Sequence, residues 1–175
     1  MLLVPEILDK FEAAKTKEEK IIVLRENVCD PLLVLLRLNY DHMLKMDLPE
    51  GEPPFRKDTD KPIGYSESSL QLELRRFYVW LEPTVSLPKI KKESLFVNML
   101  EGIHWTEAEV LCLAKDRKLQ TKYKSLKEDI VREAFPNALT PKPEKVKEEK
   151  APLEDRKSTR LNSSHLGISY AVFCL

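Results

Sequence analysis

The sequence predicts an all-α protein with a single small domain of about seven helices in two sub-bundles, which a proline-rich loop divides. Three observations support this. Apolar residues recur at helical spacing through most of residues 4–136. Helix-start patterns precede several of these segments, and no segment alternates convincingly as a β-strand does. The predicted parts are N-terminal helices (4–46), the loop (47–65) and C-terminal helices (66–136).

The N-terminal part begins with two predicted helices. The first starts at Pro5, because proline suits the first turn of a helix, and it ends near Lys15. Thr16 and Glu19 then form a capping box, in which each side chain bonds the backbone of the other residue. This box predicts a second helix that runs to about Asn27.

A third helix and the long loop follow. Asp30 as N-cap and Pro31 at the first position predict the helix start, and the helix runs to about Met43 or Met46. Its leucine-rich sequence is apolar nearly all round, which predicts burial. Residues 47–65 then contain four prolines and two glycines. A loop of this length is either functional or mobile.

Four further helices are predicted in the C-terminal part. Pro83 stops the first, and Gly102 suits the position that follows the end of the second. Capping boxes that begin at Thr106 and Ser125 predict the starts of the last two. The four helices span about 66–82, 89–101, 107–118 and 126–135.

Two C-terminal segments lie outside the predicted domain. Residues 137–154 are rich in Lys, Glu and Pro, so we expect a disordered tail. Residues 155–175 change abruptly in composition, and residues 155–165 and 168–175 match the translation of a short-read sequencing adapter without a mismatch. We interpret this segment as an adapter-derived artefact and exclude it from fold reasoning. The true C-terminus beyond about residue 154 is therefore not given by this sequence.

Composition excludes several classes of protein. The chain has 175 residues, 29 basic and 29 acidic residues, and 42% hydrophobic residues, so a packed core is expected. Without the adapter-like segment the balance is 26 basic and 28 acidic residues, which counts against a general nucleic-acid binder. Three cysteines favour a reducing compartment over a disulfide framework. No apolar run reaches the roughly 20 residues of a membrane span.

No catalytic, cofactor or metal site is predicted. The sequence contains no P-loop, dinucleotide fingerprint, G-x-S-x-G or H-E-x-x-H motif. Cys29, His42, His104 and Cys112 lack the spacing of zinc ligands. We therefore expect a non-enzymatic protein without a cofactor, and an enzyme of unknown type is the third and least favoured hypothesis.

Two segments are candidates for protein binding. Pro53, Pro54 and Phe55 form an extended element of the kind that docks in aromatic-lined grooves. The alternative is a loop that Phe55 anchors to the body of the protein. Arg76 and Trp80 would form an interface anchor if Trp80 were exposed. Core packing is the favoured alternative for Trp80, because tryptophan is highly buried on average.

One segment is a candidate for nucleic-acid binding. Residues 115–127 carry six basic residues and one acidic residue, enough for a few phosphate contacts. A helix-turn-helix is disfavoured, because the connection is too long and the next helix is acidic. The alternative is a solvated basic turn. The basic residues are Lys115, Arg117, Lys118, Lys122, Lys124 and Lys127.

Several strings resemble an uncharacterised family of small proteins encoded by myoviruses, chiefly marine phages of cyanobacteria. They include KTKEEKIIVLREN, LPEGEPPFRKD, LFVNMLEGIHWTEAEVLCLAKDRKL and VREAFPNAL, and the resemblance covers most of residues 5–139. It implies a phage origin, a helical fold and expression in the host cytoplasm, and it carries over no catalytic residue. We therefore expect a phage accessory protein that binds a phage or host protein, with nucleic-acid binding as the alternative and no membrane association.

Overall fold

The computed structural model describes residues 2–62, 65–81 and 86–141. In these residues the chain forms nine α-helices and one 3₁₀ helix, and no strand occurs in them. They belong to one compact unit. The prediction of an all-α fold with a single small domain is therefore confirmed. Pro83, the predicted adapter-derived segment and most of the predicted disordered tail lie outside the described residues.

The first two helices pack against each other and follow the prediction closely. They are α1 (Val4–Ala13) and α2 (Lys17–Glu26). The predicted capping box is present: Thr16 Oγ1 accepts from the Glu19 amide at 3.2 Å, and the Glu19 carboxylate accepts from the Thr16 amide at 3.3 Å. This reciprocal pairing satisfies backbone donors at the start of α2.

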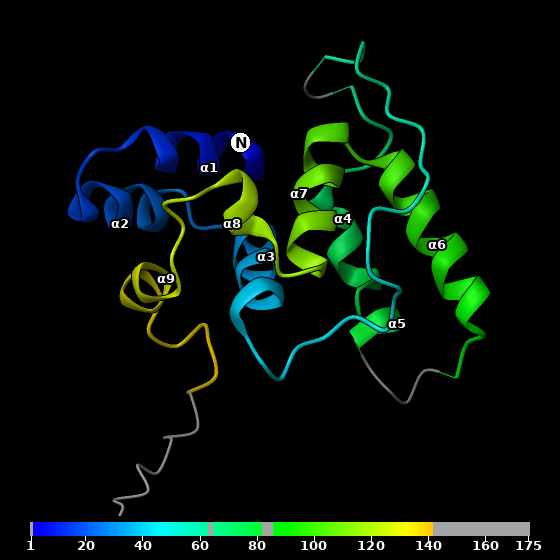
Figure 1. Ribbon diagram of the computed structural model, residues 1–175. Helices are drawn as coiled ribbons and strands as arrows, with labels where there is room; N and C mark the ends of the chain where they lie inside the picture. Colours follow the sequence, from blue (N-terminus) through cyan, green and yellow to red (C-terminus); the bar gives the residue numbers. More distant parts are fainter. Residues whose placement is uncertain (1, 63–64, 82–85, 142–175) are drawn as a thin grey trace, which may run out of the picture. The chain divides into compact units, whose positions relative to one another are not determined.

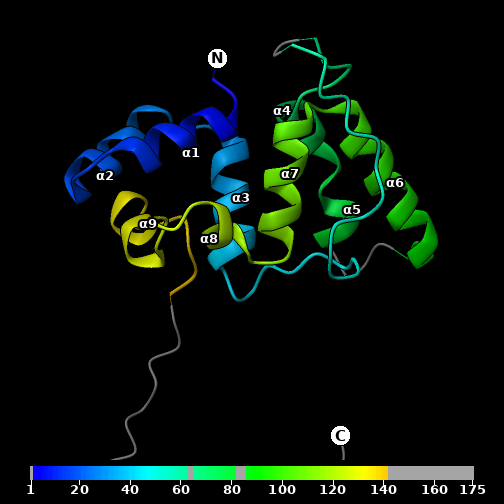
Figure 2. The same ribbon diagram turned by 45° about the horizontal axis from the view of Figure 1, so that its top comes forward.

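The centre of the fold is the packing of α3 against α7, which lie side by side in both ribbon views (Figures 1 and 2). α3 (Asp30–Tyr40) starts one residue earlier than predicted, with Cys29 as its N-cap. It ends at Tyr40 instead of Met43 or Met46. The chain leaves the helix at Asp41, whose side chain accepts a hydrogen bond from the Met43 amide at 3.0 Å.

The predicted continuous helix over 66–82 is wrong, because the segment is divided into α4 (Leu70–Glu73), η1 (Leu74–Arg76) and α5 (Tyr78–Leu81). The amide of Trp80 bonds the carbonyl of Phe77 at 3.0 Å, a spacing of three residues. This tighter winding brings side chains three residues apart onto one side. Both rings enter the core and meet edge to face, with centroids 5.9 Å apart.

The next two helices are α6 (Lys89–Gly102) and α7 (Trp105–Lys115). α6 agrees with the prediction within one residue. α7 begins two residues before its predicted start, because the N-cap is His104, whose ring accepts from the Thr106 amide at 3.4 Å. It ends at Lys115 rather than near residue 118, because the next turn contains Arg117 at a φ of 59°.

The last two helices correct the third predicted capping box. The short α8 (Leu119–Lys122) was not predicted, and α9 (Glu128–Ala134) begins after Lys127. Ser125 does not cap α9. Its hydroxyl donates to the Glu12 carboxylate at 3.1 Å, so a tertiary partner replaces the local one.

The helices do not divide at the loop into an N-terminal and a C-terminal sub-bundle. α9 packs on α2, while α7 packs on both α3 and α1. At one of these contacts Arg25 donates to the carbonyls of Glu133 and Ala134, at the end of α9. Lys17 and Glu133 add an ion pair of 2.5 Å. The sub-bundle prediction is therefore wrong, since both parts of the chain share one hydrophobic core.

The packed region also extends past residue 136, into the segment predicted to be disordered. Leu139 is buried in the core. The Thr140 hydroxyl and amide both donate to the buried carboxylate of Asp41. The prediction of disorder is therefore wrong for residues 137–141, where one apolar side chain and one buried acceptor fix the chain.

A buried carboxylate, Glu107, lies where two helices begin. Its side chain accepts from the Leu70 amide at 3.4 Å, at the start of α4, and the Val4 amide at the start of α1 also acts on it. Burial raises the pKa of Glu107, and the two backbone amides lower it by less. The net pKa lies above the ordinary value for glutamate, so folding disfavours the charged form.

We predict that Glu107→Gln changes how stability depends on pH. The folded protein takes up a proton on Glu107 at a higher pH than the unfolded chain does, so the wild type gains stability relative to the variant as pH falls. The unfolding free energy of Glu107→Gln minus that of wild type should therefore decrease from pH 7 to pH about 4. Urea titrations at several pH values measure this difference, and a difference that grows as pH falls would contradict the prediction.

Candidate interaction groove

The segment that follows α3 (residues 41–57) is held in place by the end of α7, although it forms no helix or strand. Lys115 Nζ donates to the Pro49 carbonyl at 2.7 Å and pairs with the Asp116 carboxylate. The same carboxylate accepts from the Gly51 amide at 2.9 Å. Gly51 has a φ of 97°, a conformation that residues with a side chain rarely adopt.

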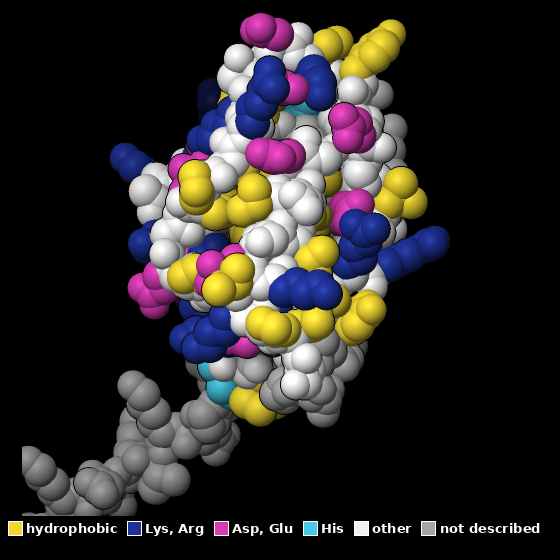
Figure 3. Space-filling view, turned by 90° about the vertical axis from the view of Figure 1, so that its right-hand side faces the viewer, with side chains coloured by type: hydrophobic (Ala, Val, Ile, Leu, Met, Phe, Trp, Pro, Cys, Tyr) yellow, Lys and Arg dark blue, Asp and Glu magenta, His cyan; other side chains and the backbone are white. Residues whose placement is uncertain are grey.

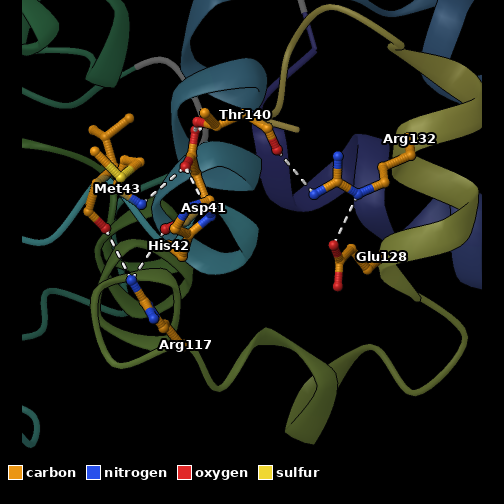
Figure 4. Close-up of polar contacts among 8 residues, drawn as sticks. Asp41, His42, Met43, Arg117, Glu128, Arg132 and Thr140 are labelled. Atoms are coloured by element: carbon orange, nitrogen blue, oxygen red, sulfur yellow. Dashed lines mark hydrogen bonds and ion pairs between the residues drawn. The ribbon is translucent and has the colours of Figure 1, made fainter. Parts of the chain in front are cut away.

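Arg117 anchors the start of this segment. Its guanidinium donates to the carbonyls of Asp41 and Leu44, at 3.0 and 3.1 Å (Figure 4). The left-handed backbone at Arg117 turns the chain after α7. We call Lys115, Asp116 and Arg117 the α7 clamp, because their three side chains bind four residues of the segment.

A second set of contacts joins the segment to α5 and α6. Lys92, whose side chain is 5% exposed, pairs with Asp47 at 2.8 Å. The Asp47 amide donates to the Trp80 carbonyl at 2.9 Å, and Trp80 Nε1 donates to the Lys92 carbonyl at 3.0 Å. These bonds close a polar link through the buried tryptophan.

This link corrects the hypothesis that Trp80 is an exposed anchor. Trp80 is 2% exposed, and its ring meets Phe96 edge to face with the centroids 5.7 Å apart. Core packing accounts for it, as the alternative interpretation stated. Arg76 is exposed and pairs with Glu73 at 3.3 Å. The two residues therefore do not form one surface site.

The predicted proline element is present at the surface with its phenylalanine turned inward. Phe55 is half-buried against the core, and the adjacent Arg56 amide donates to the Glu101 carboxylate at 3.1 Å. Pro53 is half-buried and Pro54 is exposed. Phe55 thus anchors the loop, while the two prolines are presented at the surface.

Those prolines form one wall of a groove of about 550 Å³, and the outer face of α6 forms the other wall. Figure 3 views the molecule from the side of α6 and shows apolar side chains on this face with charged ones between them. The apolar side chains that line the groove are Leu48, Pro49, Pro53, Pro54, Ile90, Phe96 and Val97, and the carboxylates are Glu50, Glu52 and Glu93.

The α6 wall was missed at the sequence level. Ile90 and Val97 lie seven residues apart, two helical turns along one face, and Ile90 is 78% exposed. The spacing alone does not identify the site, because other apolar residues of the same helix, such as Phe96 and Met99, are buried. Only the position of the proline segment distinguishes the two faces.

The basic segment 115–127 does not form one positive surface. Lys115 and Arg117 bind the loop, and Lys122 pairs with Glu109 at 2.7 Å. The three other basic residues of the segment are exposed, and within the described chain their ammonium groups have no hydrogen bond or ion pair. They are Lys118, Lys124 and Lys127.

A buried polar network joins the segment after α9 to the end of α3. Arg132 donates to the Thr140 carbonyl at 3.1 Å and to Glu128 at 2.8 Å, while Thr140 donates to Asp41 (Figure 4). Burial raises the pKa of the Asp41 carboxyl, but hydrogen bonds from Thr140 and Met43 outweigh it, so that pKa lies below its ordinary value. Asp41 thus acts as a fixed structural acceptor.

Neither cysteine in the described chain is set up as a nucleophile. Burial raises the pKa of the Cys112 thiol to about 12 and also raises that of Cys29. Thiols with raised pKa values stay protonated and weakly reactive at neutral pH. Across residues 2–62, 65–81 and 86–141, no three His, Cys, Asp or Glu side chains gather closely enough to hold a metal ion. None of the described helices has the length and apolar character needed to cross a membrane.

The fold and surface define a small all-α protein with an open, largely apolar groove between a clamped proline segment and a helix. The chain belongs to DUF6433, a family of unknown function, whose family model matches residues 7–121. The matched region includes every residue that lines the groove and the whole α7 clamp. Searches of curated proteins and of solved structures find no match.

We predict that Arg117→Met lowers stability more than the neighbouring change Lys118→Met. Methionine keeps the aliphatic stem of Arg117 but cannot donate to the Asp41 and Leu44 carbonyls. The expected loss is about 1 kcal/mol in the free energy of unfolding, measured by urea denaturation. Lys118 has no such partner, so its change should have little effect. Equal losses in the two variants would show that the clamp contributes nothing through these bonds.

Proposed function

We propose that this is a non-enzymatic phage accessory protein that acts by protein–protein interaction in the infected host cell. The observation that carries the proposal is the groove, in which a large apolar side chain, Ile90, is exposed beside Pro53 and Pro54. Exposed apolar surface with a polar rim is typical of interaction sites. The partner would be a phage or host protein.

The phage origin and the host cytoplasm as location rest on the resemblance of several sequence strings to small myovirus proteins. Membership of a family of unknown function is compatible with this origin and adds no activity. The interpretation of residues 155–175 as adapter is likewise a proposal, which rests on the unbroken match of residues 155–165 and 168–175 to an adapter translation.

The alternative is a nucleic-acid-binding accessory protein. Three exposed lysines of the segment 115–127 support it, while the engagement of Lys115, Arg117 and Lys122 inside the fold reduces the available positive charge. Phosphate contacts require accessible cations, so the alternative now depends on Lys118, Lys124 and Lys127.

The protein-binding proposal predicts a partner that depends on Ile90. Affinity capture from infected cells should recover a specific protein with the wild type and lose it with Ile90→Asp, because a charge in the apolar wall opposes burial of the partner. Ile22→Asp is the matched control, since Ile22 is 51% exposed on α2, outside the groove lining. Both exposed changes should leave the melting temperature nearly unchanged. Capture that is identical for all three proteins would count against the groove.

The nucleic-acid alternative predicts a different result. Fluorescence anisotropy with a labelled DNA duplex should show binding that weakens steeply with salt. Replacing Lys118, Lys124 and Lys127 by glutamine should lower the salt slope by about three contacts. Glutamine at Lys10, Lys45 and Lys91, which are exposed elsewhere, is the control. A salt profile that the first triple change leaves unaltered would end this alternative.

A further inference from the structure

The helical wall of the groove presents apolar groups at an interval that suits a second helix. Ile90 and Val97 are separated by about 10 Å along α6, as the rise of an α-helix dictates. An amphipathic helix that lies along this wall presents anchors at positions i, i+3, i+4 and i+7 at matching intervals. The proline wall can then enclose the same anchors from the other side.

The proline wall is unsuited to pairing with a β-strand. A strand partner needs backbone groups from alternate residues of the segment. One alternate set consists of Pro49, Gly51 and Pro53, in which two residues lack an N–H and the Gly51 amide is bound to Asp116. The other set ends in Pro54. Recognition by side chains is therefore favoured over addition of a strand.

The charged residues that line the groove leave a negative rim. Glu50 and Glu93 are exposed, and neither has a hydrogen bond or ion pair with the rest of the described chain. Glu52 pairs with Lys57 at 2.6 Å. Lys115 is the one basic residue in the lining, and its ammonium group is bound to Asp116 and to the Pro49 carbonyl. Two free carboxylates thus face solvent beside the apolar walls.

We propose that the groove binds an amphipathic helix of a partner protein whose apolar face is flanked by lysine or arginine. This inference rests on the proposed function and specifies its partner by chemistry. The apolar anchors occupy the space between Ile90, Val97 and the prolines, and the basic side chains meet Glu50 and Glu93. Complementary charges at the rim guide encounter and select the partner, while the apolar contacts supply most of the affinity. The negative rim repels a nucleic acid.

The experiment is a selection from a displayed library of random peptides of about 20 residues, long enough to form a helix. The full chain is the target. Selected peptides are then tested against wild type, Ile90→Asp, Ile22→Asp and the double variant Glu50→Lys/Glu93→Lys. Peptides that bind wild type and Ile22→Asp but not Ile90→Asp define the groove-dependent set. Circular dichroism confirms that each variant is folded, and Ile90→Ser replaces Ile90→Asp if aspartate lowers the melting temperature.

We expect the groove-dependent peptides to be net positive, with apolar residues at spacings of three and four. Synthetic copies should bind the double variant about tenfold more weakly than wild type, and the difference should shrink at high salt. Groove-dependent peptides that are acidic, or that bind the double variant equally well, would overturn the basic partner and leave the protein-binding function standing. Groove-dependent peptides rich in proline would overturn the helix. A selection in which no peptide depends on Ile90 would overturn the groove itself, and Ile90-dependent binding of a DNA or RNA oligonucleotide would replace the protein partner with nucleic acid.

Discussion

The position of the whole proline segment depends on the carboxylate of Asp116. It accepts from the Gly51 amide and pairs with Lys115, whose side chain is only 3% exposed and also bonds the Pro49 carbonyl. An almost buried ammonium group is stable only while its charge partner and its acceptors are present. The pair therefore fixes three residues of the loop relative to the end of α7. Without it, one wall of the groove has no defined place.

Ordering a segment of this length without regular structure has a high entropic cost, of about 1–2 kcal/mol for each residue. The compensation comes from attachments spread along the chain. Arg117 holds its beginning, Lys92 binds Asp47, the α7 clamp holds Pro49 and Gly51, and Phe55 packs on the core. Attachment points this frequent are unnecessary for a simple connection between helices. They are consistent with a loop whose surface is used.

The parts of the fold that were predicted from sequence are those determined by local interactions. The Thr16 capping box and the bounds of α6 depend on residues within a few positions of each other, so the pattern suffices. The errors arise where a distant partner is stronger than a local one. Ser125 binds Glu12, more than one hundred residues away, and the carboxylate of Asp41 orders Thr140 in a segment with a disordered composition.

The same distinction explains the candidate sites. Pro53 and Pro54 line the groove, as a polar, proline-rich loop suggested, but Trp80 and half of the basic segment are used inside the fold. Six basic residues close in sequence do not make a positive surface, because consecutive residues of a helix and the turn after it point in different directions. Glu93 and Ile90 lie on a helix face that becomes a site only when the loop covers its edge. No local pattern contains that information.

The α7 clamp and the groove are coupled through Lys115, which belongs to both. If the clamp opens in a fraction of the molecules, only the remaining fraction has an intact groove, and the apparent affinity falls in proportion to that fraction. A partner in the groove binds the closed form and so stabilises the clamp by the same free energy. Changes at Arg117 therefore act on binding through the population of the closed loop, whereas changes at Ile90 act through direct contact. The two kinds of change leave different traces, because only the first is reversed by anything else that stabilises the loop.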